Sequence, residues 1–153
     1  MKRAATIVAV LIPLAGLLSA PAVGSPARHA GVIALPRLLI IEGSNQFAVR
    51  PHEVEFLGDG SGILGRLSGE HPPGSLHWTS WTLGGANAHG TVWINDCKPD
   101  CAAGHWHHYA VKASAYRVRS GRYTRLRLRY AVGKKKINHV FSLQRLGPNW
   151  NWF

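Results

Sequence analysis

The chain has 153 residues and a formal net charge of +11, because 18 Lys and Arg residues stand against 7 Asp and Glu residues. This length accommodates one domain, and so few carboxylates give little support to an enzyme that needs an acid–base pair. Residues 25–100 carry five basic and seven acidic side chains, whereas residues 101–153 carry eleven basic side chains and no acid. This asymmetry favours an anionic partner for the C-terminal part; a merely solvated charged surface is the alternative.

Residues 1–24 are predicted to be a secretory signal peptide. Lys2 and Arg3 precede an apolar run from about Ile7 to Leu18, and small residues follow it. This is the order of a basic region, an apolar region and a cleavage zone, and cleavage is expected after Ala22 or Gly24. The alternative is an N-terminal anchor that is not cleaved, although the apolar run is too short to span a bilayer comfortably.

The rest of the chain is predicted to form one all-β domain. Residues 25–37 show no strong periodicity and are expected to be a flexible mature N-terminus. Residues 38–153 contain no convincing helical period, which favours a single antiparallel β-sandwich-like domain. With no stable transmembrane span after signal cleavage, the expected location is secreted and extracellular, with cell-wall association as a further option. The oligomeric state is left open.

Two candidate strands and a turn begin this domain. Leu38–Glu42 is a short apolar run that predicts a buried strand. Gln46–Leu57 predicts a second strand, which Pro51 restricts to an edge or a bulge. Gly58–Gly62 (GDGSG) is a turn cluster, and its Ser61 lacks the flanking glycine spacing of a nucleophile elbow. We therefore interpret this segment as a turn.

Two tryptophans mark the next candidate strand. Leu76–Leu83 (LHWTSWTL) is rich in Trp and Thr, the composition of a strand. Trp78 and Trp81 are three residues apart, so a regular strand would point them to opposite faces, one in the core and one exposed. Gly84–Gly90 is interpreted as a flexible loop.

A three-stranded meander is predicted near the C-terminus. Ser120-Gly121 is a two-residue hairpin signal between Tyr109–Arg119 and Arg122–Val132. A second turn through Gly133–Lys136 would place Ile137 opposite Val132, and the aromatic tail is expected to pack back onto the body. The first turn also sets the register, which gives three polar pairs: Lys112 with Arg129, Ser114 with Arg127, and Tyr116 with Arg125.

This register gives the meander an apolar face and a basic face. The apolar face pairs Ala113 with Leu128 and Ala115 with Leu126, while Val118 and Tyr123, near the turn, are placed on the basic side. The basic face is the predicted anion-binding site, because Arg and Lys side chains bind phosphate or carboxylate. Its five predicted residues are Lys112, Arg125, Arg127, Arg129 and Tyr116.

Two alternatives to anion binding are open for the basic face. An antiparallel sheet commonly has one solvated side, so the arginines could be a simple solvated surface. Alternatively, carboxylates from the first half could fold over and neutralise them, and the candidates are Glu42, Glu53, Glu55 and Glu70. Lys112 opposite Arg129 is a like-charge pair that should destabilise the sheet in the absence of a ligand. A bound anion would offset this repulsion, which favours the anion-binding interpretation.

Cys97 and Cys101 are the only cysteines, and in an exported chain they most simply form a disulfide. The alternative is a metal site made of Cys97, Cys101, His105 and His107, since zinc accepts such mixtures. It requires reduced cysteines outside the cell, and His107 and His108, being adjacent, would point apart on a strand. No cofactor is predicted.

Three motifs together resemble those of small, uncharacterised secreted proteins of high-GC Gram-positive bacteria. They are Gly58–Gly62 (GDGSG), Leu76–Trp81 (LHWxxW) and Trp93–Gly104 (WxNxCxPxCAxG). The resemblance covers about residues 50–143. It implies export and a cysteine loop of this kind, and it carries no activity.

The function predicted from the sequence is a secreted, non-catalytic module. Its expected ligand is an anionic extracellular polymer of the cell wall or extracellular matrix, with nucleic acid and acidic lipid as further candidates, bound through the basic sheet face. One alternative is a cell-wall-directed hydrolase, which would need Asp59 or Asp96 beside a histidine in a cleft. The second alternative is a purely structural surface protein.

Overall fold

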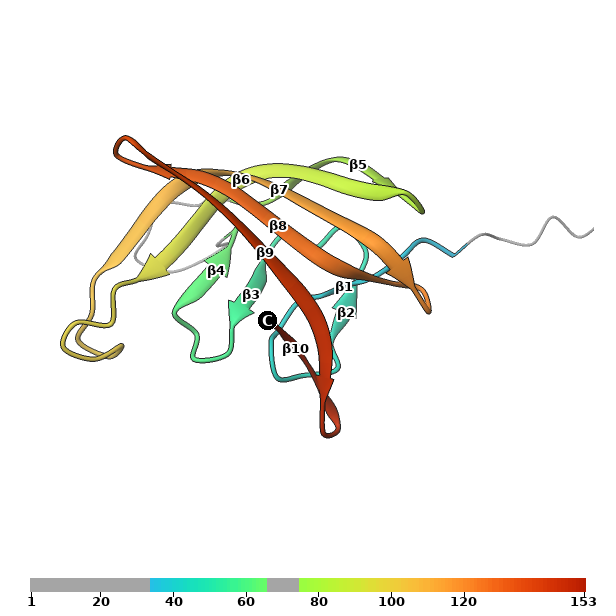
Figure 1. The fold of residues 1–153 in the computed structure, drawn as a ribbon, viewed down its shortest axis with the longest axis horizontal. Helices are drawn as coiled ribbons and strands as arrows, with labels where there is room; N and C mark the ends of the chain where they lie inside the picture. The colour runs from blue at the N-terminus through green and yellow to red at the C-terminus, as the bar shows by residue number, and fades with distance from the viewer. Residues whose placement is uncertain (1–33, 66–74) are drawn as a thin grey trace, which may run out of the picture. The chain divides into compact units, whose positions relative to one another are not determined.

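The computed structural model describes residues 34–65 and 75–153 (Figure 1). The predicted signal peptide, residues 1–24, lies outside the described residues. Within these two ranges, no helix has the length and hydrophobicity that a membrane crossing requires. Ten strands form instead, with these bounds: β1 Leu38–Leu39, β2 Phe47–Ala48, β3 Val54–Leu57, β4 Gly62–Leu64, β5 His77–Thr82, β6 Gly85–Asn95, β7 Trp106–Arg119, β8 Arg122–Val132, β9 Lys135–Leu146 and β10 Asn149–Trp152.

Eight of the strands form one antiparallel sheet, in the order β10-β9-β8-β7-β6-β4-β3, and β5 also pairs with β6. Strand β6 has two partners on one edge because its N-terminal half pairs with β5 and its C-terminal half with β4. β1 and β2 form a separate two-stranded sheet. The prediction of an all-β, antiparallel, sandwich-like domain is confirmed, and the predicted meander is part of a longer run of consecutive strands from β6 to β10.

The segment around β1 connects the two edges of the large sheet. Ile41 forms a parallel bridge with Glu55 of β3, and Ser44 bridges Trp150 of β10. The backbone N–H of Arg37 donates to the carbonyl of Gly121 at the β7–β8 turn. Figure 1 shows β6 to β9 arching over these elements. The result is a near-barrel with one core, and its hydrogen bonding begins just before the predicted domain start at residue 38.

The core lies inside this arch because each long strand alternates in burial. In β7 the small apolar residues at 111, 113 and 115 are buried, and the residues between them are exposed or half-buried. The predicted packing of the tail is confirmed, since β10 pairs with β9 and Trp152 is buried. The largest fully buried apolar side chains are Trp93, Tyr123, Leu38, Leu39, Leu64, Leu76, Leu126, Leu128, Val54 and Val92.

The β7–β8 hairpin has the predicted register, with Lys112 opposite Arg129 and a two-residue turn. Ser120 and Gly121 have φ values of 48° and 70°, as the primed turn of a tight hairpin requires. The placement of Tyr123 on the basic side is wrong, because its side chain is fully buried and its hydroxyl donates to the carbonyl of Thr82 at 2.5 Å. Arg117 has a left-handed φ of 57°, and the alternation of faces changes at this point.

The β8–β9 turn is shorter than predicted. Val132 pairs with Lys135 and Tyr130 with Ile137, so only Gly133 and Lys134 form the turn. Gly133 supplies the positive φ, 57°, that so tight a turn needs. The whole strand is therefore shifted by two residues from the prediction, and a shift of two leaves each side chain on its expected face.

Two predictions about β5 and β6 are wrong. A bulge between Trp78 and Ser80 adds one residue to β5, so Trp78 and Trp81 lie on the same side in edge-to-face contact, with ring centroids 4.6 Å apart. The supposed loop at 84–90 is strand, because a turn at Leu83 and Gly84 sends the chain straight into β6.

Candidate anion-binding face

The outer face of the sheet carries a row of basic and polar side chains that crosses five strands. Directly paired residues of an antiparallel ladder point to the same face, so the register defines the row. It begins at the β5 edge with two histidine rings whose centroids are 5.6 Å apart. In strand order from β5 to β9 the row is His77, His89, Lys112, Arg129 and Asn138.

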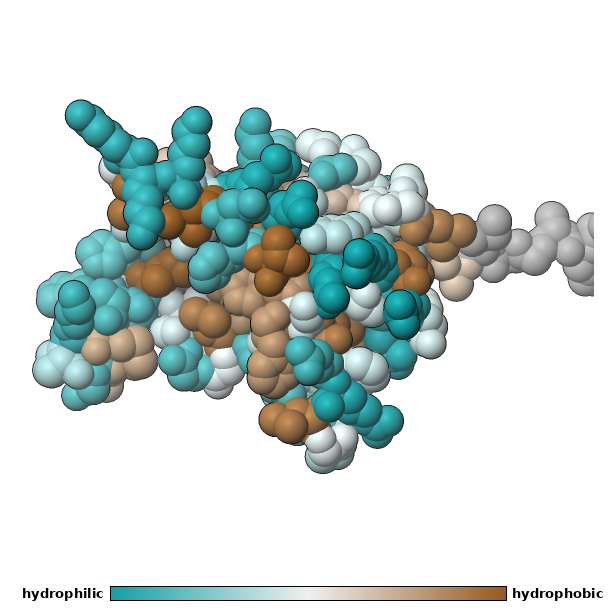
Figure 2. Space-filling view, in the orientation of Figure 1, coloured by the Kyte–Doolittle hydropathy of each residue, from teal (hydrophilic) through white to brown (hydrophobic). Residues whose placement is uncertain are grey.

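A trough runs beside this row, next to the part of β7 and β8 where no pairing follows Lys112 and Arg129. It has a volume of about 1020 Å³ and is lined by the whole row. Ala110 and Ala131 also line the trough, together with the buried Val111 and the half-buried Tyr130 and Ile137. Lys136 also lines the trough. Figure 2 shows hydrophilic side chains projecting along the upper edge, where β6 to β9 run.

A second, smaller hollow lies on the other side of the same row. Its volume is about 210 Å³, and it shares His89, Lys112 and Arg129 with the trough. Ser114 and Asn87 lie beside it and bond to each other, since the Ser114 hydroxyl donates to Asn87 Oδ1 at 3.0 Å. The central cations of the row therefore have an open hollow on both sides.

The structure divides the predicted anion-binding residues among three environments. Lys112 and Arg129 are exposed and line the trough. Arg125 is half-buried and lines a different cavity, near the β7–β8 turn. Arg127 lies between them, and its guanidinium carbon is 5.3 Å from the ring centroid of Tyr116.

Tyr116 is paired with Arg125 in the register, as predicted. Its ring lies under Arg127, and Arg127 Nη2 donates to the Tyr116 hydroxyl at 3.4 Å. The Arg127 Nε is buried and makes no hydrogen bond with the described chain. One face of the Tyr116 ring is thus already occupied by a cation.

No carboxylate of the described chain lines the trough or the smaller hollow. The ion pairs within residues 34–65 and 75–153 all end on Asp96, which faces His105 and His107 at the far end of β6. Glu42, with Glu55 and Asp59 as its neighbouring charges, is at another part of the domain, where burial raises its pKa. Glu70, the fourth acid considered, lies outside the described residues. Lys112 and Arg129 therefore remain a like-charge pair in the register.

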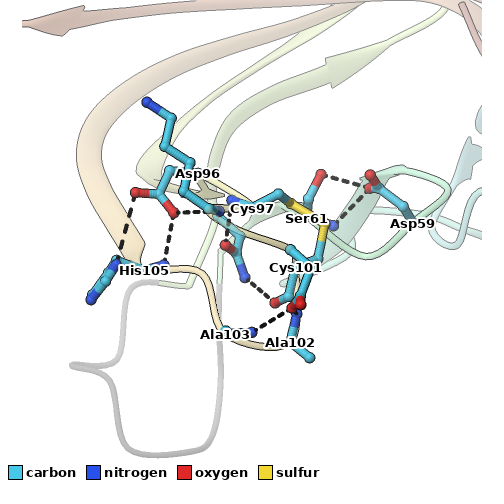
Figure 3. Close-up of a disulfide and its surroundings, with 11 residues drawn as sticks. Asp59, Ser61, Asp96, Cys97, Cys101, Ala102, Ala103 and His105 are labelled. Atoms are coloured by element: carbon cyan, nitrogen blue, oxygen red, sulfur yellow. Dashed lines mark hydrogen bonds and ion pairs between the residues drawn. A yellow bond between two sulfur atoms is a disulfide. The ribbon is translucent and has the colours of Figure 1, made fainter.

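The predicted disulfide is confirmed between Cys97 and Cys101 (Figure 3). The Asn95 side chain holds this loop: its Oδ1 accepts the backbone N–H of Cys97 at 2.9 Å, and its Nδ2 donates to the carbonyl of Cys101 at 2.8 Å. Both sulfurs are bonded to each other, so neither is a thiolate that could bind a metal. With both sulfurs in the disulfide, Cys97 and Cys101 cannot form the alternative metal site with His105 and His107.

Asp96 meets part of the requirement for the hydrolase alternative. Its Oδ2 lies 3.4 Å from His107 Nε2 and 3.9 Å from His105 Nδ1. The backbone N–H of His105 donates to its Oδ1 at 2.9 Å, and this bond, more than any other contact, lowers the pKa of the Asp96 carboxyl. Both histidines are exposed, and neither lines the trough, the smaller hollow or the cavity near the β7–β8 turn.

Asp59 has a structural part in its turn. Its Oδ1 accepts the backbone N–H of Ser61 at 2.9 Å and the Ser61 hydroxyl at 2.6 Å, and these bonds lower the pKa of the Asp59 carboxyl. This is the pattern of an aspartate that closes a turn. The interpretation of Gly58–Gly62 as a turn is confirmed, with β4 beginning at its last residue.

His77 and His89 were missed as candidate site residues. The available signal was the alternation in β6, where Ala86 and Ala88 are buried while Asn87 and His89 are exposed. Reading these residues as a strand would have placed His89 beside Lys112. Comparisons of this chain with family models, with curated proteins and with solved structures give no match.

Proposed function

We propose that this chain is an exported, non-catalytic module that binds a linear anionic polymer along the outer face of β5 to β9. The single observation that carries the proposal is the row through His89, Lys112 and Arg129, which is open on both sides and has no described carboxylate against it. Uncompensated cations on one face attract polyanions and release their counterions on binding.

Export is proposed on two grounds. The first is the order of basic, apolar and small residues in residues 1–24. The second is the disulfide of Cys97 and Cys101, a bond that persists in oxidising compartments. The N-terminal sequence of the protein recovered from culture medium tests this, with a start at Val23 or Ser25 expected and a start at Met1 opposed to it.

A flexible polymer chain fits this face better than nucleic acid or a lipid surface. The trough is a hollow, which a thin chain can enter and a flat bilayer cannot follow. Recognition of single-stranded nucleic acid relies on exposed aromatic rings, and Arg127 already occupies one face of the Tyr116 ring. Teichoic acid and similar wall polymers present closely spaced anionic groups to the cations, as the proposal requires.

The test is a salt series of binding to purified wall teichoic acid. The binding variant is Lys112→Gln with Arg129→Gln, and the matched control, with the same change in net charge, is Lys98→Gln with Arg145→Gln. The binding variant should weaken affinity about a hundredfold, and the slope of log affinity against log salt should fall by about one per cation removed. The control should bind nearly as wild type.

Equal losses in the two double variants would reject the proposal, since net charge alone would then explain the binding. Binding that does not depend on salt would also reject it. Single-stranded DNA and vesicles of acidic phospholipid serve as competing probes. Tighter binding of either one than of teichoic acid would replace the polymer by that ligand class.

A further inference from the structure

A second cationic cavity lies at the end of the β7–β8 hairpin, away from the trough. Its volume is about 470 Å³, which is within the range of small-molecule sites. None of its lining residues is a carboxylate. Its lining consists of four arginines, two hydroxyl side chains and two apolar side chains: Arg117, Arg119, Arg122, Arg125, Ser120, Thr124, Leu143 and Trp150.

We propose that this hairpin pocket binds a phosphomonoester, a compact phosphoryl group with two negative charges. Four arginines line one small volume, and guanidinium is the group that binds phosphate oxygens in pairs. The site goes beyond the proposed polymer binding: it shares no lining residue with the trough. A phosphodiester, with a single charge and two substituents, uses this pocket less well.

The sequence gathers these arginines through two local features. The Ser120-Gly121 turn places Arg119 directly opposite Arg122. Arg117 adopts a left-handed φ of 57°, so that it lines the pocket while the neighbouring Val118 packs against the core. The Thr124 hydroxyl donates to the carbonyl of Arg117 at 2.8 Å and holds this conformation.

A left-handed φ is unfavourable for arginine, and such strain persists at positions where it serves binding. A glycine at 117 would adopt the same backbone without strain. The arginine therefore contributes its charge at a cost in stability.

One of the four guanidinium groups is held in advance of binding. The guanidinium carbon of Arg122 lies 4.8 Å from the ring centroid of Phe47 and 5.4 Å from that of Trp150. Stacking on two rings reduces the side-chain entropy that binding would otherwise cost. Because Trp150 also lines the pocket, a ligand that enters it will change the tryptophan emission.

The experiment uses the full mature chain and three probes: glycerol 3-phosphate, glycerophosphocholine and inorganic sulfate. Calorimetry and tryptophan fluorescence measure the binding at physiological salt. Glycerol 3-phosphate should bind at least tenfold more tightly than either of the other two. Equal affinity for all three probes would overturn the proposal, because the pocket would then be a simple anion exchanger.

Two substitutions at one position separate binding from folding. Arg117→Gln and Arg117→Gly should each weaken glycerol 3-phosphate binding about tenfold, and Arg117→Gly should fold at least as stably as the wild type. Wild-type affinity in both variants would overturn the proposal. Lys112→Gln with Arg129→Gln is the matched control: it should leave glycerol 3-phosphate binding intact while teichoic acid binding falls. The two proposals can thus fail separately.

Discussion

The acidic side chains of the cysteine loop have hydrogen-bond partners within the loop, whereas the cations on the outer face of the sheet have no carboxylate partner in the described chain. In the loop, short acidic and amide side chains bond to nearby backbone groups: Asp96 accepts from the N–H groups of His105 and Lys98, and Asp100 accepts from those of Ala102 and Ala103. On the outer face, the described chain offers no carboxylate to Lys112 or Arg129. The acidic groups of the loop are therefore hydrogen-bonded within the loop, whereas the cations of the outer face can bind an external anion.

The difference follows from side-chain length. An Asp or Asn carboxyl or amide group reaches an N–H two residues on, and so closes turns. Lys and Arg carry their charge at the end of a long stem, which projects from a strand into solvent. A row of them on one face therefore repels itself unless an anion is present.

The largest effect is expected for Gly104→Ala, in the loop. A Cβ at this position would collide with Asn95 Oδ1 and would lie 2.8 Å from the Cys97 nitrogen. Overpacking costs about 1–3 kcal/mol, and displacing the buried Asn95 amide adds about 1–3 kcal/mol for polar groups left unpaired. We expect about 3 kcal/mol less stability in urea unfolding.

The control for this change is Gly84→Ala, in the β5–β6 turn. A Cβ there would meet only the Thr82 hydroxyl, at 3.7 Å, so the loss should be below about 0.5 kcal/mol. A similar loss in both variants would mean that the loop is no more tightly fitted than an ordinary turn, and the contrast with the outer face would weaken.

A smaller effect of opposite sign is expected on the face. Lys112→Thr removes the like charge opposite Arg129 and introduces a residue that favours strands. Without ligand, the variant should be about 0.5 kcal/mol more stable than the wild type at low salt, and the gain should shrink as salt screens the repulsion. Urea unfolding at two salt concentrations measures it. A loss of stability would show that Lys112 has a favourable contact of its own.

Much of the meander could be predicted from the sequence. Ser120-Gly121 is a strong turn signal, and strict alternation in the flanking strands leaves only one register that buries Leu126 and Leu128. The basic face follows from this register by geometry alone. The disulfide followed from the presence of just two cysteines, four residues apart.

The rest depends on local irregularities that have weak sequence signals. Nothing in the sequence marks Arg117 as left-handed, because only glycine and asparagine adopt that conformation readily. The bulge before Ser80 likewise depends on how β5 packs against β6. Each irregularity changes which face a side chain occupies, so the hairpin pocket and the edge-to-face pair of tryptophans were not predicted.

The smallest expected effect is on the pH dependence of stability. It has opposite signs for Glu42 and for the pair Asp59 and Asp96. Burial, followed by the charges of Asp59 and Glu55, raises the pKa of Glu42. Its contribution to stability is therefore complete below the unfolded pKa, about 4.3, and is lost as pH rises through the folded pKa. The lowered pKa values of Asp59 and Asp96 have the opposite sign: their contribution is present above about pH 3.9 and is lost as pH falls through the folded values.

Glu42→Gln should consequently be more stable than the wild type at pH 7 and equal to it below about pH 4, the unfolded range of a glutamate. Asp96→Asn should be less stable at pH 7, and its deficit should shrink as the solution is acidified. Free energies of unfolding in urea, measured between about pH 4 and pH 7, give the difference in stability of each variant from the wild type. A Glu42→Gln curve parallel to the wild type at all pH values would mean that this carboxyl is no more buried in the folded protein than in the unfolded chain. The contrast between the two groups of acids would then rest on Asp59 and Asp96 alone.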